Sequence, residues 1–424
     1  MRLVRRFGLV CAKLAAVGLL VTGAAACAGV AAAPAAATHS AAGSASTAPE
    51  DAGLNGQPAF VTAVPAVDKT KSAAKRSSSP TASSAASASA ATVSGGTTLQ
   101  AGNPDGHASV PAAGLAVDTS HPDHVIGDGS PAGCTSAAVV QAVGEGGIIT
   151  FDCGPSPVTI TMTATAKVVN TSHQVVLDGG GKVTLSGAGT TRILYMNTCD
   201  PAQKYTTSDC WEQQWPQLVV QNMTLTDAYS AIQQSSTASY GGGAIFDEGG
   251  QLKVVNSVFT GDQCYASGPD LGGGAIRATG MYMQDPVYIT NDTFTDNSCS
   301  NGAALSGLYA NFAVYNSRMT GNKAIGSGAN PAASGTPGGG SGGAIYTDGD
   351  GYNLIVDGSV MTGNTAREGG GAIFFVVDAD GGTLTIDGST LSDNTSGAFQ
   401  NAPGIFDEVN SVVTQPVESG SSVS

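Results

Sequence analysis

Gly242-Gly-Ala-Ile245, followed by Asn256-Ser-Val-Phe-Thr-Gly-Asp262, is one copy of a two-part phrase that recurs through the second half of the chain. The copies recur about every 30 residues, and the second part follows the first by about 14 to 18 residues. The other copies of the first part are 273–276, 342–345 and 370–373, with Gly302-Ala-Ala-Leu305 as a looser copy, and those of the second part are 291–297, 316–322, 358–364 and 388–394. Repeats of this length, made of short β runs and turn residues, predict a solenoid.

Each copy carries the features of one coil of a parallel β-helix. Between its two parts lies a short alternating run such as 252–254, whose apolar residues would point inward and whose polar residues would point outward. The paired glycines allow a corner with positive φ and a close approach of neighbouring coils. Stacked Asn297, Asn322, Asn364 and Asn394 would bond to each other and to the turn backbone. We therefore predict an all-β fold, a single-stranded right-handed parallel β-helix over residues 129–410.

These repeats resemble those of a known group of proteins. The Gly-Gly-Ala-Ile copies and Phe294-Thr-Asp-Asn297 are similar to the GGA-[ILV] and F-x-x-N repeats of bacterial polymorphic outer-membrane and adhesin-like proteins, within the pectate-lyase-like β-helix class. Asp262 replaces one Asn of this pattern. The resemblance covers roughly the second half of the chain and implies the fold. It leaves the activity open, because the class includes lyases, glycosidases, esterases, epimerases and non-catalytic adhesins.

The N-terminal sequence predicts export from a bacterial cell. A basic start and an apolar run at 14–21 predict a secretory signal peptide over residues 1–33. Alternatively, Ala24-Ala-Ala-Cys27 resembles the lipobox of bacterial lipoproteins, and Cys27 would then carry lipid; otherwise Cys27 is removed with the signal. Residues 34–128, rich in Ala, Ser, Thr and Pro, are predicted to form a disordered linker, and residues 411–424 a disordered tail. The predicted location is the cell surface or the medium, with membrane contact only through a lipid on Cys27.

The charge balance narrows the range of partners. The chain has 424 residues, of which only 12% are charged, and its formal net charge is −15. An excess of acidic residues argues against nucleic acid as a partner. A polyanionic polymer would also be repelled unless metal ions intervened.

The cysteines predict disulfides. An even number of them follows the signal segment, as is usual in exported chains with disulfides. Cys264 and Cys299 follow Asn256 and Asn291 at the same distance, so they would lie on adjacent coils about 4.8 Å apart, close enough to bridge. The other pairs would be Cys134–Cys153, between a capping helix at 135–143 and the first strand, and Cys199–Cys210, across a loop. A zinc site is the alternative, but the absence of C-x-x-C spacing and only five His residues disfavour it.

Candidate ligand-binding residues are aromatic. The loop at 197–217 contains Tyr205, Trp211 and Trp215, whose rings would stack on sugars or, in the other interpretation, cover the side of the β-helix. Insertions at 228–240, 263–272 (with Tyr265) and 323–341 occupy one slot of the repeat, so they would line one edge. Neutral insertion at a tolerant corner is the alternative.

Asp247 and Glu248, beside Arg277 of the next coil, are the candidate catalytic residues. In a lyase, Arg277 would abstract a proton while the two carboxylates held Ca²⁺ against a uronate. In a glycosidase, the carboxylates would have to lie about 5–9 Å apart as acid and base or nucleophile. Neighbours in a strand point to opposite faces, however, so a surface ion pair is the simpler interpretation.

Two functions stay open. The first is a non-catalytic exported protein that binds an extracellular polysaccharide or another cell-surface component through a loop-lined edge. The second is a polysaccharide lyase or glycoside hydrolase, for which Ca²⁺ is a candidate cofactor. We favour the first, because the repeats are regular and no repeat column gathers carboxylates.

Overall fold

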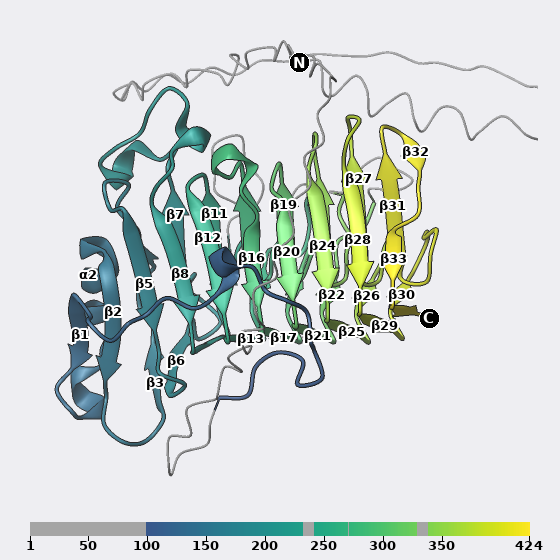
Figure 1. The fold of residues 1–424 in the computed structure, drawn as a ribbon. Helices are drawn as coiled ribbons and strands as arrows, with labels where there is room; N and C mark the ends of the chain where they lie inside the picture. Colours follow the sequence, from purple (N-terminus) through teal and green to yellow (C-terminus); the bar gives the residue numbers. More distant parts are fainter. Residues whose placement is uncertain (1–98, 232–240, 270, 329–337) are drawn as a thin grey trace, which may run out of the picture. The chain divides into compact units, whose positions relative to one another are not determined.

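The computed structural model describes residues 99–231, 241–269, 271–328 and 338–424. All of them belong to one unit, Thr92–Ser424. The predicted signal segment with Cys27, and residues 34–98 of the predicted linker, lie outside the described residues. The described residues include one α-helix, α2 (Ser136–Glu145), and many short strands in four sheets, which we call A to D (Figure 1).

Sheets A and B form two walls of the stack. Sheet A contains, in spatial order, β1 (His124–Gly127), β2 (Gly147–Asp152), β5 (Gln174–Asp178), β8 (Gln217–Gln221), β12 (Gln251–Val255), β16 (Val287–Thr290), β20 (Phe312–Tyr315), β24 (Asn353–Asp357), β28 (Thr383–Asp387) and β33 (Val417–Ser419). Sheet B contains β3 (Val158–Thr161), β6 (Val183–Ser186), β9 (Thr224–Thr226), β13 (Val258–Thr260), β17 (Thr293–Thr295), β21 (Arg318–Thr320), β25 (Val360–Thr362), β29 (Thr390–Ser392) and β34 (Ser422–Val423).

Sheets C and D complete each coil. Sheet C contains β4 (Ala166–Lys167), β7 (Leu194–Asn197), β11 (Ile245–Glu248), β15 (Ile276–Thr279), β19 (Leu305–Leu308), β23 (Ile345–Asp348), β27 (Ile373–Val377), β31 (Ile405–Val409) and β32 (Val412–Val413). Sheet D contains β10 (Tyr229–Ser230), β14 (Gln263–Cys264), β18 (Ser298–Cys299), β22 (Lys323–Ala324), β26 (Thr365–Ala366) and β30 (Thr395–Ser396). The short helices are η1 (Ala112–Gly114), η2 (Pro131–Gly133), η3 (Pro201–Gln203), η4 (Cys210–Glu212) and η5 (Tyr282–Gln284).

Each copy of the repeat forms one coil that passes through sheets C, A, B and D in turn. The first complete copy supplies β11, β12, β13 and β14, and the next supplies β15, β16, β17 and β18. Corresponding residues of the two copies are parallel neighbours, for example Ile245 with Ile276 and Phe259 with Phe294. The prediction of an all-β fold with stacked parallel strands is confirmed, and the arrangement is compatible with a parallel β-helix.

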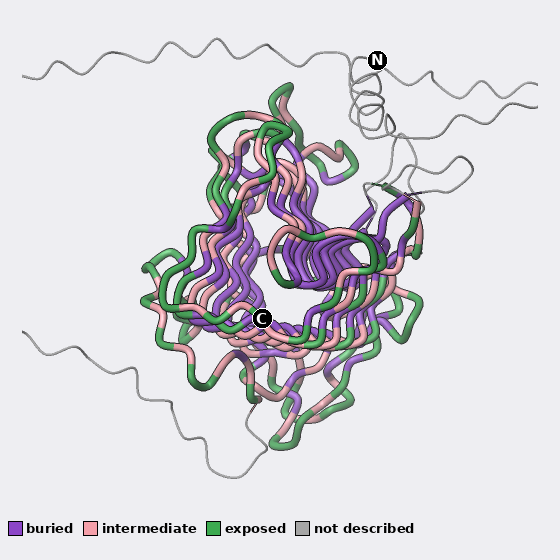
Figure 2. Tube along the Cα trace, turned by 90° about the vertical axis from the view of Figure 1, so that its right-hand side faces the viewer, coloured by how far each residue is buried: buried purple, intermediate pink, exposed green. Residues whose placement is uncertain are grey.

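The core is a set of apolar columns on the inner faces of the sheets. Ile245, Leu252, Val254 and Phe259 of one coil are all at most 2% exposed. Viewed along the stack, buried residues follow one another at corresponding places on successive coils (Figure 2). The rings of Phe259 and Phe294 stack with their centroids 4.9 Å apart. A single coil cannot bury such a face, so the apolar burial depends on stacking.

The predicted asparagine ladder is present at the corner between sheets B and D. Asn297, Asn322, Asn364 and Asn394 are buried, and the Nδ2 of each of the first three donates to the Oδ1 of the next at 2.9 Å. The same amides donate to backbone carbonyls of the preceding coil, as Asn322 does to Phe294 at 3.1 Å. The ladder therefore satisfies turn groups that have no partner within their own coil.

A second ladder, which the sequence analysis did not predict, lies at the corner between sheets A and B. The backbone N–H of each member donates to a side-chain oxygen of the next at 2.7–3.1 Å. Its members are Ser257, Asp292, Ser317, Ser359, Ser389 and Ser421.

The structure corrects the prediction of a tail without structure at 411–424. Strand β33 pairs with β28, and β34 pairs with β29. The reason is a shortened copy of the repeat: Gly420-Ser-Ser-Val423 aligns with Gly388-Ser-Thr-Leu391. Ser421 accordingly takes its place at the end of the serine ladder.

The predicted linker boundary at residue 129 is also wrong. Residues 99–123, which we call the N-terminal strap, cross the outside of sheet A (Figure 1). Ala108 and Asn316 exchange two hydrogen bonds, of 2.8 and 3.0 Å. Val117 and Gln221 likewise exchange two, both of 2.9 Å. Paired hydrogen bonds to side chains of the sheet hold the strap, and its Ala- and Gly-rich composition gave no sign of them.

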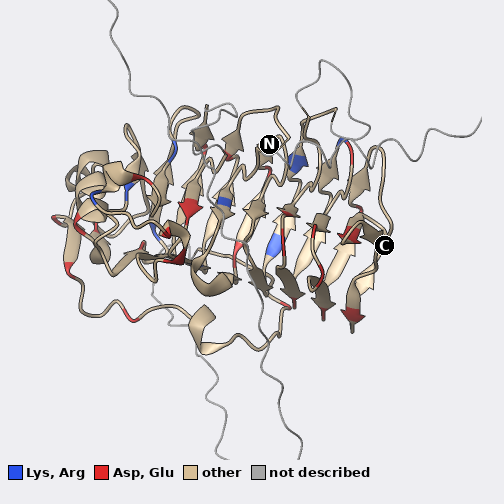
Figure 3. Cartoon of the chain, turned by 90° about the horizontal axis from the view of Figure 1, so that it is seen from above, with Lys and Arg blue, Asp and Glu red and all other residues tan. Residues whose placement is uncertain are grey.

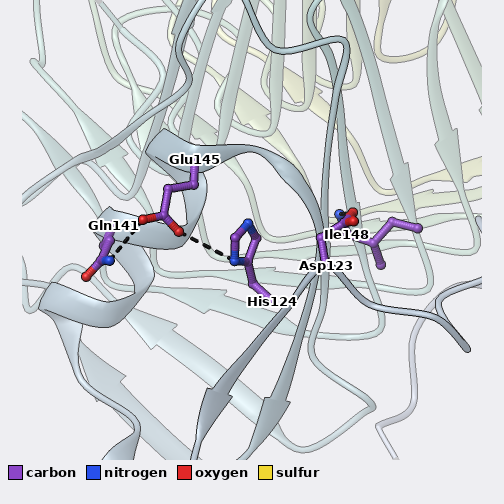
Figure 4. A network of polar contacts seen from close by, with 5 residues as sticks. All are labelled: Asp123, His124, Gln141, Glu145 and Ile148. Atoms are coloured by element: carbon purple, nitrogen blue, oxygen red, sulfur yellow. Dashed lines mark hydrogen bonds and ion pairs between the residues drawn. The ribbon is translucent and has the colours of Figure 1, made fainter.

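The predicted capping helix is confirmed as α2. Thr135 accepts a hydrogen bond from the backbone N–H of Ala138, as a helix N-cap does. Val139 and Val143 are fully buried against the first coil. On the outer side of α2, His124 lies 3.4 Å from Glu145, which also accepts a hydrogen bond from Gln141 (Figure 4). Among the described residues no helix combines the length and the apolar character needed to cross a membrane.

Candidate functional site

The three predicted disulfides are present. Cys134–Cys153, Cys199–Cys210 and Cys264–Cys299 have Cα–Cα distances of 5.7, 5.0 and 4.7 Å. The last joins β14 to β18, the two adjacent strands that the repeat register predicted. Three disulfides are typical of an extracellular or otherwise oxidising compartment.

The loop at 197–217 folds onto the corner between sheets C and A, and Trp211 anchors it there. The Trp211 Nε1 donates to Glu248 at 3.0 Å, and its ring stacks on Tyr309 with centroids 6.1 Å apart. A Cβ added to Gly280 would lie 2.7 Å from the Trp211 ring, so the glycine is what lets the indole approach the corner. Trp211 thus packs across several coils, which supports the covering role rather than the sugar-stacking role.

Glu248 is half-buried beneath this loop. One oxygen accepts the Trp211 indole N–H, and the other accepts Nδ2 of Asn197 at 2.7 Å. Burial raises the pKa of Glu248 above its ordinary value. The two hydrogen bonds and the charge of Arg277 oppose this rise in pKa, and the charge of Asp200 adds to it.

Asp247 lies on the opposite face of β11, inside the stack. It is 0% exposed and in register with Met196 and Ala278, both core residues. Neither carboxyl oxygen has a hydrogen-bond partner in the structure. Burial, and secondarily the charge of Glu248, raise the pKa of Asp247 well above its ordinary value. The strand alternation therefore separates the two neighbouring carboxyls that the sequence proposed as a catalytic pair.

Arg277 lies on the outer face of sheet C but is only 1% exposed. It is in register with Phe246 and Ser306, and its guanidinium donates to the Ser306 hydroxyl. Glu248 and Arg277 thus share the outer side of sheet C and act on each other electrostatically, whereas Asp247 does not join them. Among the described residues no group of three or more His, Cys, Asp or Glu side chains is placed to hold a metal ion.

The exposed aromatic groups lie at the start of β5 and β8. The Trp215 ring is 39% exposed and stacks on His173 with centroids 4.3 Å apart. Tyr205 is 46% exposed, and its carbonyl accepts Nδ2 of Asn170 at 2.8 Å. The main chain of Tyr205 and the ring of Trp215 therefore contact the same turn, 170–173, and we call His173, Tyr205 and Trp215 the aromatic patch.

Sequence reasoning did not single out His173 as a functional residue. A distance of 42 residues separates it from Trp215. The sequence could have indicated this contact through the alignment of 174–178 with 217–221. Gln174 and Gln217 begin β5 and β8 and are register partners. Residues that precede register partners lie side by side at the same corner.

Tyr265 does not belong to the aromatic patch. It packs against Cys264, Leu271 and Cys299 in a small separate cluster. Part of the predicted loop edge, at 232–240, 270 and 329–337, lies outside the described residues. The described part of the second insertion folds back onto the next coil, where the Gly268 carbonyl accepts the Ser300 hydroxyl at 2.7 Å.

The charged residues of the stack are mostly acidic and scattered, as Figure 3 shows from above. Comparison with protein-family models, with curated proteins and with solved structures found no match for this chain. Any assignment of function therefore has to be argued from the residues of this chain and their contacts.

Proposed function

We propose that this is an exported bacterial protein, secreted or held at the cell surface, in which a right-handed parallel β-helix presents the aromatic patch to an extracellular polysaccharide. The observation that carries the proposal is Trp215, which is exposed and whose ring stacks on His173. Aromatic faces of this kind bury apolar area against a ligand at little cost in conformational entropy. The ligand is bound without being chemically changed.

The placement of the predicted catalytic residues supports binding over catalysis. A lyase base must reach the sugar, and Arg277 is 1% exposed. Asp247 points into the core, so it cannot share a metal ion with Glu248 at the surface. Uronate polymers would in addition meet a protein of formal net charge −15.

A glycoside hydrolase remains the second candidate, because one observation favours it. Glu248 has the raised pKa expected of a general acid, and a second carboxyl, Asp200, acts on it electrostatically. In this candidate Glu248 would protonate the leaving oxygen and Asp200 would be the base or nucleophile. The two hydrogen bonds that occupy Glu248 must then be exchanged for contacts with substrate.

Sedimentation of the full chain with insoluble chitin, cellulose and peptidoglycan tests the binding proposal. We expect retention on at least one polymer and a loss of about tenfold in affinity for Trp215→Ala, equivalent to about 1.4 kcal/mol. Tyr315→Ala, an outward tyrosine on sheet A, should bind like the unchanged protein. Equal retention of all three proteins, or retention of none, would contradict a role for the aromatic patch.

Release of reducing ends from the same polymers separates the two candidates. The binding proposal predicts no release by the unchanged protein. Turnover that Glu248→Gln abolishes while retention persists would establish the hydrolase instead.

A further inference from the structure

Two buried carboxyls stand where neighbouring coils carry neutral side chains. Asp262 occupies the asparagine ladder position, and Asp292 occupies the serine ladder position. Both are 0% exposed. They lie on consecutive coils, and these are the two coils that the Cys264–Cys299 disulfide joins.

Asp262 makes only some of the hydrogen bonds that the asparagines of its ladder make. Its backbone N–H donates to Asn297 Oδ1 at 2.9 Å, and its Oδ1 accepts the Ala228 N–H at 2.9 Å, as an asparagine would. Its Oδ2, however, has no hydrogen-bond partner in the structure. At this place the other members carry an amide Nδ2 that donates to a carbonyl of the preceding coil, as Asn297 does to Phe259 at 3.3 Å.

The register identifies the group that Asp262 would need to satisfy. Leu225 is the neighbour of Phe259 in sheet B, so its carbonyl corresponds to the carbonyl that Asn297 contacts. An ionised carboxylate offers that carbonyl no donor and places like partial charges together. A protonated Asp262 carries one O–H, which restores the donor that the ladder has at every other member.

Asp292 is enclosed differently, because both of its oxygens already have donors. Its two oxygens accept the backbone N–H groups of Ser257 and Thr290 at 2.7 and 2.8 Å, and its own N–H donates to the Ser317 hydroxyl at 3.0 Å. Serine at this position donates its hydroxyl to a backbone carbonyl, as Ser257 does to Val255. Asp292 has no such hydroxyl donor, and its two N–H donors favour the ionised form against the cost of burying its charge.

We propose that these two coils form an acid-favoured element, in which Asp262 is protonated when the asparagine ladder is fully packed, and in which its ionisation loosens the coils that Cys264–Cys299 holds together. The insertion at 263–272 emerges from the same coils. Rising pH would therefore loosen the base of that insertion first, while the disulfide keeps the coils from separating.

The surrounding charges reinforce the effect of burial. Burial is the main cause that raises the pKa of each carboxyl well above its ordinary value. Asp227 of the preceding coil adds to the rise in the pKa of Asp262. The backbone N–H groups of Ala228, Ser257 and Thr290 oppose it without cancelling it. A carboxyl whose pKa is raised by folding contributes stability that is fully present below its unfolded-state pKa and is lost as the pH rises from there through its folded-state pKa.

Thermal unfolding of the full chain between pH 4 and pH 8 tests the proposal. We expect the unfolding midpoint of the unchanged protein to fall as the pH rises. Asp262→Asn should raise the midpoint at pH 8 by at least about 2 °C and flatten its pH dependence. Asp296→Asn is the matched control, because Asp296 lies on the same coil as Asp292 at an outer turn with positive φ that asparagine tolerates, and its profile should follow the unchanged protein.

Two results would overturn the proposal. One is a midpoint that does not fall between pH 4 and pH 8 in the unchanged protein. The other is an Asp262→Asn variant that keeps the full pH dependence or melts lower than the unchanged protein at pH 8.

Discussion

Asn322→Ala is expected to lower the free energy of unfolding by about 3 to 5 kcal/mol, because it leaves buried backbone and amide groups on both neighbouring coils without partners. Asn322 Oδ1 accepts the N–H and the Nδ2 of Asn297. Its own Nδ2 donates to the Phe294 carbonyl and to Asn364. Alanine can replace none of these bonds, and water cannot reach a residue that is 0% exposed.

Urea unfolding followed by circular dichroism measures the effect. The control is Asn353→Ala, at the exposed start of β24, which should change the free energy of unfolding by less than about 0.5 kcal/mol. If Asn322→Ala costs no more than Asn353→Ala, the ladder does not stabilise the stack.

Gly343→Ala is expected to cost about 3 kcal/mol or more, because the added methyl group would collide with backbone rather than with a movable side chain. A Cβ at this position would lie 2.7 Å from the carbonyl oxygen of Thr365, at the end of the same coil, and closer still to that of Gly371 in the following coil. The coil spacing is set by backbone hydrogen bonds such as Gly343 N–H to Gly370, so the collision cannot be relieved locally. In this coil the second glycine of the repeated phrase is thus a spacing requirement, whereas the copy at 302–305 has Ala303 at the same position.

Gly144→Ala provides the comparison. Gly144 lies in α2, and a Cβ there would meet nothing within 4 Å. Alanine is the better helix former, so this change should be neutral or stabilise the protein by about 0.5–1 kcal/mol. Thermal midpoints that fall equally for both variants would mean that close coil approach is not the reason for the glycine.

The sequence predicted features that depend on repetition. Corresponding residues of successive copies lie side by side. This rule predicted the Asn297–Asn394 ladder and the pairing of Cys264 with Cys299. The same rule could have found the end of the stack, where Gly420-Ser-Ser-Val423 is a shortened copy. This copy lacks the Gly-Gly-Ala-Ile part of the repeat, and its four residues alone are too short to be recognised as a repeat.

Features that depend on contacts between different parts of the repeat were not predictable. The strap bonds its Val117 to Gln221 across 104 residues, and no period links the two positions. Trp211 reaches Glu248 because the loop at 197–217 folds upward over later coils, a direction that its sequence does not encode. The alternation of β11 did predict that Asp247 and Glu248 point apart, but not that the inner carboxyl would be left without a donor.

The account rests on one claim, that corresponding residues of successive copies are nearest neighbours along the stack. Oxidative cross-linking of the double variant Thr320→Cys with Thr362→Cys tests it most directly, because the two threonines are register partners on the outer faces of β21 and β25. We predict that peptide mapping finds a disulfide between the two introduced cysteines, because the Cα spacing of register partners is already sufficient for Cys264–Cys299. No link in that variant, together with a link when Thr320→Cys is combined with Ser392→Cys two coils away, would contradict the stack.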